Sequence, residues 1–272
     1  MRLDLHIHTT ASDGAWSAAE VARAAARGGL DVIAVTDHDT AAGVAPALEA
    51  GRALDVQVLS GIEVSSTHER RDVHVLGYGM DPEVPALVRY AERASRRREE
   101  RMREMIRRLA RQGIDVDFRE VEDAAGPDRV NIARPHLARV LASRGFASSV
   151  VDAFNTLIGD GHPAFVPTGL LGPADAVGLV LEAGGIPVWA HPPGDLIDSL
   201  LPTLVSAGLR GLEVYRPSHA RPDVLRLERI CHTAGLLMTG GSDWHTPDSG
   251  AALGDFFVSG DEVERFLEEV GI

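Results

Sequence analysis

The chain has 272 residues with 27 basic and 40 acidic side chains, so its formal net charge is −13, and this acidic balance argues against a general nucleic-acid-binding surface. All basic residues are arginine and the only cysteine is Cys231, which excludes Schiff-base lysines, a Walker-A loop, a carbamylated-lysine metal bridge and a disulfide framework. A hydrophobic share of 44%, no run of about 18 apolar residues and no signal-peptide pattern predict a globular cytoplasmic protein without membrane association.

The first part of the chain alternates short strands with helices. Residues 3–8 alternate apolar and polar side chains, as a strand does, and the nearly continuous apolar run at 31–36 is typical of a strand buried on both faces. Helices are expected at 17–27 and about 41–53, and a further strand at 56–62. This order predicts a parallel α/β sheet or barrel.

The alternation stops between residues 84 and 165, where the sequence indicates several helices and no strand. After Pro173 it resumes, with the following expected order: helix 173–183, strand 186–189, helix 196–206, strand 211–214, helix 221–234, strand 236–239 and a strand–helix pair at 252–269. The simplest interpretation is a discontinuous βα barrel formed by residues 1–83 and 166–272. Residues 84–165 would form a helical insert or cap.

The insert begins with an arginine-rich segment. Residues 89–111 contain ten arginines, and Glu92, Glu99 and Glu104 each precede an arginine by four positions, the favourable order for ion pairs on a helix. Apolar residues also recur at helical spacing. We interpret the segment as a long helix with a solvated charged face; the alternative is a basic rim that attracts anionic substrates.

Histidines and carboxylates gather where the expected strands end, the edge at which parallel βα folds place their active sites. They are His6, His8, Asp13, His38, Glu63, His191, Asp243 and His245, and His74 lies inside a further short strand-like run at 72–76. Residues i and i+2 of a strand share a face, so His6 and His8 can bind one ion together, as can Asp243 and His245 if that segment is extended. Imidazole and carboxylate donors arriving from several strands indicate a cluster of divalent ions.

Several of these motifs, taken together, resemble the polymerase and histidinol phosphatase (PHP) family. They are Asp4-Leu5-His6-Ile7-His8-Thr9, Thr36-Asp37-His38-Asp39, Gly61-Ile62-Glu63, Ala190-His191-Pro192 and Ser242-Asp243-Trp244-His245, in this order along the chain. The insert and Asn131-Ile132-Ala133-Arg134-Pro135-His136 resemble the bacterial branch that acts on nucleoside 3′,5′-bisphosphates and short 5′-phosphorylated oligonucleotides. The resemblance implies a distorted seven-stranded βα barrel, a trinuclear metal site and phosphoesterase activity.

The resemblance also implies roles for individual residues. All nine of the histidines and carboxylates that gather at this edge would be metal ligands, holding two to three ions of manganese, zinc or iron and acting through the water that these ions activate. Glu63 would bridge two ions, and Asp37 would orient His38. Asp39 is assigned no role.

A second phosphate on the substrate would need protein donors of its own. Arg134 is the best candidate because a guanidinium can bind two phosphate oxygens at once, although a surface salt bridge is the alternative for it. His136 would assist or cap a helix. Arg216 and His219 would contact a phosphate or the leaving group, or belong to a solvated loop.

The leading hypothesis is a metal-dependent phosphoesterase that removes the terminal phosphate of a small nucleotide, most simply a nucleoside 3′,5′-bisphosphate. A 5′→3′ exonuclease on short oligonucleotides is the main alternative. Histidinol phosphate is disfavoured because histidinol is a cation, whereas Arg134 offers a site for an anion. A non-catalytic metal-binding module is the alternative from another class, and no obligate protein partner is expected.

Overall fold

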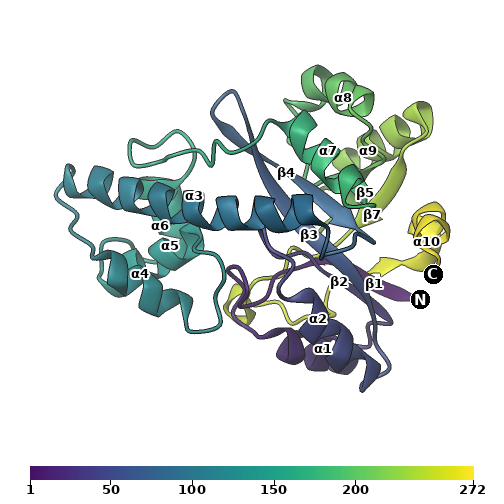
Figure 1. The fold of residues 1–272 in the computed structure, drawn as a ribbon, viewed down its shortest axis with the longest axis horizontal. Coiled ribbons are helices and arrows are strands. Elements are labelled where there is room, and N and C mark those ends of the chain that lie inside the picture. Colours follow the sequence, from purple (N-terminus) through teal and green to yellow (C-terminus); the bar gives the residue numbers. More distant parts are fainter.

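The computed structural model describes the backbone of residues 1–272 and every side chain apart from that of Ser249. Eight strands form one sheet in the order β7-β6-β5-β4-β3-β2-β1-β8, which curls into a nearly closed barrel (Figure 1). The strands are β1 (Arg2–Ile7), β2 (Val32–Val35), β3 (Gln57–His68), β4 (Arg71–Tyr78), β5 (Ile186–Trp189), β6 (Gly211–Tyr215), β7 (Leu237–Gly240) and β8 (Val258–Ser259). The α/β barrel is therefore confirmed, with eight strands rather than the expected seven.

The distortion of the barrel comes from its middle strands. β1, β2 and β3 are parallel, as are β5, β6 and β7, but β4 runs antiparallel to both β3 and β5. Glu69 and Arg70 join β3 to β4 with φ values of 47° and 68°, the left-handed conformation that a two-residue hairpin turn requires. The prediction of a strand at 56–62 was wrong about where the strand ends, because β3 continues to His68 and carries Glu63 in its interior.

Helices cover the outside of the barrel (Figure 1). They are α1 (Ala18–Arg27), α2 (Val44–Arg52), α7 (Pro173–Glu182), α8 (Ile197–Ser206), α9 (Arg221–Ala234) and α10 (Glu264–Val270), with 3₁₀ turns at Pro247–Ser249 and Gly260–Val263. The start of α1 shows how local sequence sets a boundary. Ser17 accepts a hydrogen bond from the Glu20 backbone N–H, and the Glu20 carboxylate accepts one from the Ser17 N–H, so together they cap the helix.

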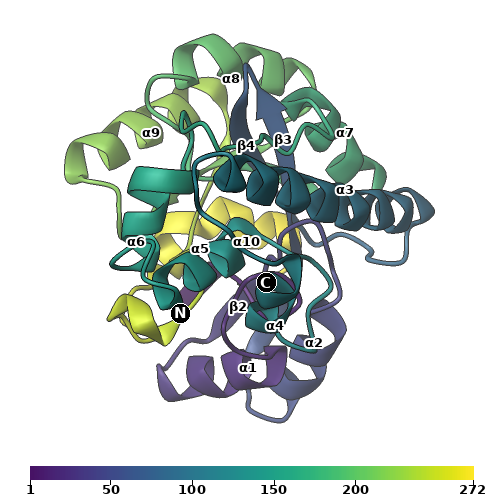
Figure 2. The same ribbon diagram turned by 90° about the vertical axis from the view of Figure 1, so that its left-hand side faces the viewer.

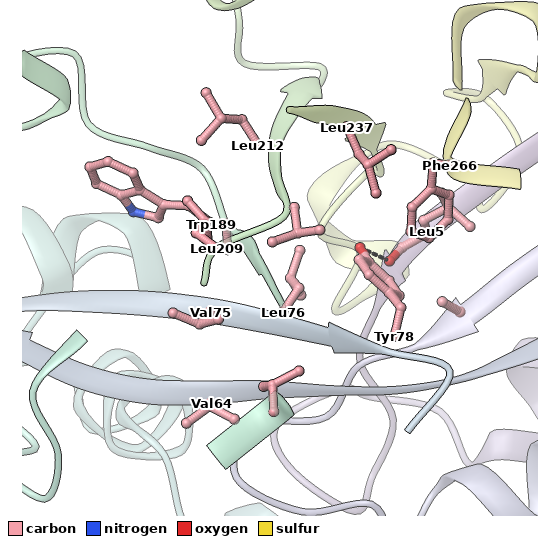
Figure 3. Packing of buried hydrophobic residues seen from close by; sticks show 14 of the residues in the cluster. Leu5, Val64, Val75, Leu76, Tyr78, Trp189, Leu209, Leu212, Leu237 and Phe266 are labelled. Atoms are coloured by element: carbon pink, nitrogen blue, oxygen red, sulfur yellow. Dashed lines mark hydrogen bonds between the residues drawn. The ribbon is translucent and has the colours of Figure 1, made fainter. Parts of the chain in front are cut away.

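The barrel core holds the strands in register (Figure 3). Tyr78 is fully buried, and its hydroxyl donates a hydrogen bond of 2.8 Å to the Leu5 carbonyl, which joins β4 to β1 across the barrel. Its ring meets Phe266 of α10 edge-on, with the centroids 5.1 Å apart. A buried hydroxyl that has a partner avoids the penalty of an unsatisfied polar group, so this contact fixes the strand positions beneath the site.

The segment between β4 and α7 lies to one side of the barrel (Figures 1 and 2). Its helices are α3 (Pro85–Ala110), α4 (Phe118–Ala125), α5 (Arg134–Ser143), α6 (Val150–Ala153) and a π-helical turn at Phe154–Ile158. Met105, Leu109, Val121, Leu137 and Leu141 belong to a hydrophobic cluster that is separate from the barrel core. Within the described part of the chain, no helix is both long enough and apolar enough to cross a bilayer.

Candidate metal centre

Glu63 lies at the centre of a cluster of five histidines. Its Oε1 atom is 2.9 Å from His74 Nδ1 and 3.0 Å from His191 Nε2. Its Oε2 atom is 3.0 Å from the Nδ1 atom of His38, and the Nε2 atoms of His8 and His6 lie 3.3 and 3.4 Å away. The two oxygens therefore face two separate groups of imidazoles, an arrangement in which one carboxylate can bridge two ions.

Two further carboxylates complete the cluster. Asp243 Oδ1 is 3.2 Å from His8 Nε2 and 3.4 Å from His6 Nε2. Asp13 Oδ1 lies 3.4 Å from His245 Nε2 and 3.6 Å from His8 Nδ1. All nine residues that the sequence singled out are thus brought together, although they come from segments spread over the whole chain.

Three subsets of these residues have donor atoms within 4.8 Å of one another, close enough to share an ion. The first is His8, Asp13, His38 and His245; the second is His6, His8 and Asp243; the third is His38, Glu63 and His74. The buried atoms His6 Nε2, His8 Nε2, His38 Nδ1 and Asp13 Oδ1 have no hydrogen-bond partner. A buried polar atom without a partner is costly, so these four atoms fit metal coordination.

The cluster strongly shifts the ionisation of its members. Burial alone would lower the pKa of His8, but contacts with Asp243 and Glu63 raise it to about 10. Burial would raise the pKa of Asp13, Glu63 and Asp243, but the neighbouring histidines hold it well below the usual range. Without metal, the carboxylates therefore remain ionised and hold protons on His6, His8 and His74, whose pKa values are raised. Ions that bind these groups have to displace such protons.

Buried carboxylates behind the cluster orient it. Glu213 accepts hydrogen bonds of 2.7 Å from His6 Nδ1 and from the backbone N–H of His191, so it directs His6 Nε2 toward the cluster. Asp4 accepts hydrogen bonds from the N–H and hydroxyl of Ser242 and so anchors the segment that carries Asp243. Neither role was predicted from the sequence. A carboxylate inside an otherwise apolar strand, as in Gly211–Tyr215, is the signal that could have revealed Glu213.

Asp37 and Asp39 have different partners from those expected. Asp37 accepts hydrogen bonds from the Thr9 N–H and hydroxyl and from the Ser12 hydroxyl, so it fixes the loop before Asp13 and does not orient His38. Asp39, left without a role by the sequence, is buried and accepts hydrogen bonds from Arg98 Nε at 2.7 Å, from the Ser65 N–H and from the Tyr90 hydroxyl. It thereby ties the His38 loop to β3 and to α3.

The backbone is strained at three positions around the cluster. Asp39, His191 and Asp243 have φ values of 54°, 32° and 56°, in the left-handed region that non-glycine residues seldom occupy. Such conformations persist only where surrounding contacts hold them, and they concentrate at functional sites. Hydrogen bonds hold all three residues here. Asp39 accepts one from the Ser65 N–H, the His191 N–H donates one to Glu213, and Asp243 accepts one from Arg216.

A cavity of about 290 Å³ separates the cluster from the insert; we call it the insert-facing cavity. One wall includes Asp13, His38, His74, Asp243 and His245, and the other includes Asp72, Arg98, Arg101 and Arg134. The prediction that the arginines of α3 lie on a solvated face was wrong for Arg98 and Arg101, which are both buried. Two of the expected ion pairs along the exposed face of α3 do form, Glu99–Arg103 and Glu104–Arg108.

Arg134 extends along the far wall of the insert-facing cavity. Its Nη1 atom is 2.7 Å from Asp160, its Nη2 atom is 3.5 Å from Asp72, and its guanidinium lies over the rings of Phe154 and Phe165. Arg101 Nη2 donates to the same Asp72 carboxylate at 2.8 Å. Two guanidinium groups are thus held beside one buried carboxylate, opposite the metal-ligand candidates.

The other expected substrate contacts occupy three different surroundings. His136 is buried, and its Nδ1 accepts a hydrogen bond from the Ala133 N–H, so it caps the start of α5 and does not line the insert-facing cavity. Arg216 Nη2 donates to Asp243 at 2.6 Å and so lies directly against the cluster. His219 lines a separate pocket together with His191.

Comparison with known proteins shows which proteins the chain is similar to. A family model described as the PHP domain matches residues 4–115. The chain is 38% identical over 249 residues to a phosphoribosyl 1,2-cyclic phosphate 1,2-diphosphodiesterase of Eggerthella lenta, covering 89% of this chain and 93% of that protein. It is 34% identical over 258 residues to a 3′,5′-nucleoside bisphosphate phosphatase of Chromobacterium violaceum (91% and 88% covered), and 30% identical over 258 residues to a 5′-3′ exoribonuclease of Haemophilus influenzae (93% and 93%).

Solved structures show the same similarity. An amidohydrolase of Chromobacterium violaceum with bound sulfate and no metal superimposes with a TM-score of 0.87 at 32% identity, covering 95% of this chain and 92% of that one. A protein of Bifidobacterium adolescentis assigned as a metal-dependent phosphoesterase superimposes with a TM-score of 0.88 at 30% identity, with 97% and 95% covered. The chain contains no lysine, so it cannot form the carbamylated-lysine bridge of some amidohydrolases.

Proposed function

Because the chain belongs to the PHP family and is a metal-dependent phosphoesterase, we propose that its substrate is a small nucleotide with two phosphate groups, most simply a nucleoside 3′,5′-bisphosphate. The observation that carries this proposal is the insert-facing cavity. Its barrel wall consists of metal-ligand candidates, and its insert wall presents Arg101 and Arg134. A substrate with one phosphate at each end would contact both walls.

Nine residues would hold the ions: His6, His8, Asp13, His38, Glu63, His74, His191, Asp243 and His245. Their mixture of imidazole and carboxylate donors suits manganese, zinc and iron alike. Two to three such ions would activate water and neutralise charge on the phosphoryl oxygens. Asp243 would bind an ion together with His6 and His8, Glu63 would bind one with His38 and His74, and Glu213 would hold the His6 ring in place through its Nδ1–H.

Arg134 and Arg101 would bind the second phosphate. Asp72 holds both guanidinium groups in place before a substrate arrives. The second partner of Arg134, Asp160, is 44% exposed, so an incoming phosphate can replace this weakly held carboxylate. A guanidinium remains charged and can donate two parallel N–H hydrogen bonds, so it is well matched to a phosphate dianion. Arg216, beside Asp243, would contact the scissile phosphate.

Two other substrates keep the same site. A 5′→3′ exonuclease would bind the 5′-phosphate of a short oligonucleotide at the arginines and cleave the next phosphodiester. A cyclic phosphodiester of a phosphorylated ribose is favoured by the 38% identity to the Eggerthella lenta enzyme, whose name specifies that chemistry. Histidinol phosphate fits poorly, because the arginine wall would repel its cationic group. A non-catalytic module fits poorly as well, since none of the nine ligand positions has been replaced by a non-ligating residue.

The test combines metal analysis with a substrate screen. The protein is stripped with EDTA, reloaded separately with Mn²⁺, Zn²⁺ or Fe²⁺, and assayed on bisphosphates, monophosphates, phosphoribose cyclic phosphate and short oligonucleotides, with released phosphate and shortened products measured. We expect the stripped protein to be inactive and the reloaded protein to prefer a substrate with two phosphates. A preference for simple monophosphates would contradict the proposal.

Replacing Asp13, His191 or His245 by alanine should lower turnover about 100-fold or more, because each variant loses a donor to an ion that stabilises transition-state charge. The control is His232→Ala, an exposed histidine on α9 outside the cluster, which should behave as wild type. Metal content measured on each variant shows whether the lost rate accompanies a lost ion. Near-normal turnover of the three cluster variants at saturating metal would make the ligand assignment wrong.

A further inference from the structure

A second cavity adjoins the cluster on the side of α9; we call it the α9 pocket. Its volume is about 290 Å³, and its lining includes His191, Pro193, Gly194, Ile197, His219 and Leu227. His191 belongs to the metal-ligand cluster, so the pocket reaches the same centre as the insert-facing cavity. Among the described residues the two cavities share no lining residue. The cluster therefore has one hollow toward the insert and another toward α9.

The α9 pocket combines an apolar floor with a polar rim. Ile197 and Leu227 are buried in its floor. The His219 Nδ1 atom is 2.8 Å from the Val214 carbonyl, which can only accept, so Nδ1 carries a proton and Nε2 of the neutral ring is left as an acceptor. Arg226 stands at the rim and donates to the Gly194 carbonyl. An apolar floor with a few polar groups at the edge suits a flat heterocycle such as a nucleobase.

The geometry points to a role for this pocket in substrate choice, which rests on the function proposed above. We propose that the α9 pocket binds the nucleoside on the far side of a scissile phosphodiester. A phosphate monoester has one organic arm, which the insert-facing cavity receives with the second phosphate at the arginines. A phosphodiester has a second arm, which has to leave the cluster in another direction. The α9 pocket is the hollow that offers this direction.

The reaction on such a diester balances without any further reactant. Water adds to the phosphorus, the bond from phosphorus to the 3′-oxygen of the first nucleoside breaks, and this oxygen takes up a proton. The products are a nucleoside 5′-phosphate in the insert-facing cavity and a shortened chain with a new 5′-phosphate. The nucleoside next to that new phosphate is the one held in the α9 pocket.

The size and charge of the pocket limit what it can hold. A volume of about 290 Å³ is at the lower end for ligand sites, so one nucleoside fits and the rest of a chain has to pass over the rim. At the rim, Arg226 is paired with Asp198, whose side chain is 86% exposed. Such a surface ion pair is weak, which leaves the guanidinium available to the next phosphate of a longer chain.

Gly194 provides a sharp test of the proposal. A Cβ atom built there meets only the Arg226 side chain, at 3.5 Å, and the residue does not have a positive φ, so a larger residue is compatible with the backbone. Gly194→Phe would place a ring in the pocket, whereas Gly194→Ala makes the same backbone change without filling it. Gly178→Phe, on the exposed side of α7 where a Cβ meets nothing within 4 Å, is the control for surface bulk.

The substrates are a nucleoside 3′,5′-bisphosphate and the 5′-phosphorylated dinucleotide with the same first nucleoside, both assayed on the metal-loaded protein. We expect Gly194→Phe to lower the ratio of kcat/KM for the dinucleotide to that for the bisphosphate about tenfold or more, mainly through a higher KM. Gly178→Phe should leave this ratio as in wild type, and Gly194→Ala, which adds only a methyl group to the pocket, should lower it less than Gly194→Phe does. Thermal unfolding of each variant reports whether it is folded.

If Gly194→Phe does not fold, Arg226→Glu replaces it and the 5′-phosphorylated trinucleotide replaces the dinucleotide, because the trinucleotide carries the next phosphate. The Arg226 side chain is 40% exposed, and its reversed charge should lower the ratio of kcat/KM for the trinucleotide to that for the bisphosphate. An equal loss on both substrates, or no loss on either, would overturn the role of the α9 pocket. So would a wild-type protein that hydrolyses the bisphosphate and leaves the dinucleotide intact. If the wild type hydrolyses neither substrate, the proposed function fails first, and the pocket proposal fails with it.

Discussion

At the scale of single residues, we expect the charge of Arg134 to distinguish a substrate with two phosphates from a simple phosphate ester. Its guanidinium lines the insert-facing cavity opposite the cluster and is held by Asp72 and Asp160. Arg134→Ala should therefore lower kcat/KM for a nucleoside 3′,5′-bisphosphate. The lost transition-state stabilisation should be about 2–4 kcal/mol, the usual range for losing a buried charged partner. The loss should be much smaller for a nucleoside monophosphate or a nitrophenyl phosphate, which lack the second anion.

The matched control is Arg144→Ala, an exposed arginine at the end of the same helix that pairs with Glu120. Arg144→Ala should leave kcat/KM unchanged for both substrates. Equal losses of Arg134→Ala on both substrates would assign Arg134 to the scissile phosphate or to the fold. No loss on either would leave it as a surface ion pair.

His136 gives a prediction for stability at low pH. Burial, together with nearby arginines, lowers its pKa to about 4, although Asp13 opposes the shift. Between pH 4 and about 6.5 the unfolded chain binds a proton at this histidine and the folded protein does not, so this contribution to stability falls as the pH falls. Over that pH window, this pKa shift should lower the free energy of unfolding by about 3 kcal/mol.

Urea unfolding of wild type and His136→Gln at pH 7 and at pH 4.5 tests this prediction. Glutamine does not titrate, so the free-energy difference between the two proteins should shrink, or change sign in favour of the variant, at the lower pH. A difference that does not depend on pH would show that the imidazole is not held neutral in the folded protein.

At the scale of elements, α3 acts as a joint between the insert and the barrel. It runs from the barrel into the insert (Figure 1), and its Arg98 forms a buried ion pair of 2.7 Å with Asp39, next to His38. Removing one partner of a buried pair leaves an uncompensated charge. Arg98→Met should therefore lower the free energy of unfolding by about 3–5 kcal/mol.

Arg107→Met is the control for this prediction, since Arg107 lies on the exposed face of the same helix and pairs with Glu104. Its effect should be about 0–1 kcal/mol. The double variant Arg98→Met/Asp39→Asn should recover part of the stability, because it removes the stranded carboxylate charge. Equal effects of Arg98→Met and Arg107→Met in urea unfolding would mean that the buried pair contributes little.

At the scale of the whole molecule, we expect the insert to restrict what can approach the cluster. Figure 2 shows the insert helices in front of the barrel, and residues from both parts line the insert-facing cavity. Small bisphosphates and single-stranded 5′ ends should reach the ions, whereas a folded RNA should not. A 5′-phosphorylated RNA hairpin with a blunt end should thus be hydrolysed far more slowly than a mononucleotide bisphosphate.

The same hairpin with a single-stranded 5′ extension is the control, because the extension should be shortened until the stem stops it. Product lengths on a denaturing gel measure the hydrolysis of the two hairpins. Comparable rates for the blunt hairpin and the bisphosphate would count against an insert that restricts access.

The nine metal-ligand candidates show what the sequence alone indicates, since all of them except Glu63 and His74, which lie inside β3 and β4, come at or after the end of a strand. Their positions follow from local rules, because a period of two defines a strand, residues i and i+2 share a face, and the ends of parallel strands meet at one edge. The same rules predicted the βα alternation and most helix boundaries, as the Ser17 cap of α1 illustrates. These features depend on near neighbours in the chain, so a single sequence carries them.

The burial of Arg98 and Arg101 shows what only the tertiary structure decided. On the helix they resemble their exposed neighbours, and they can be buried only because Asp39 and Asp72 arrive from distant segments to neutralise them. The role of Glu213, the length of β3 and the α9 pocket likewise depend on contacts between residues far apart in sequence. A buried charge is tolerated only beside its partner, and that partner is defined by how the whole chain packs.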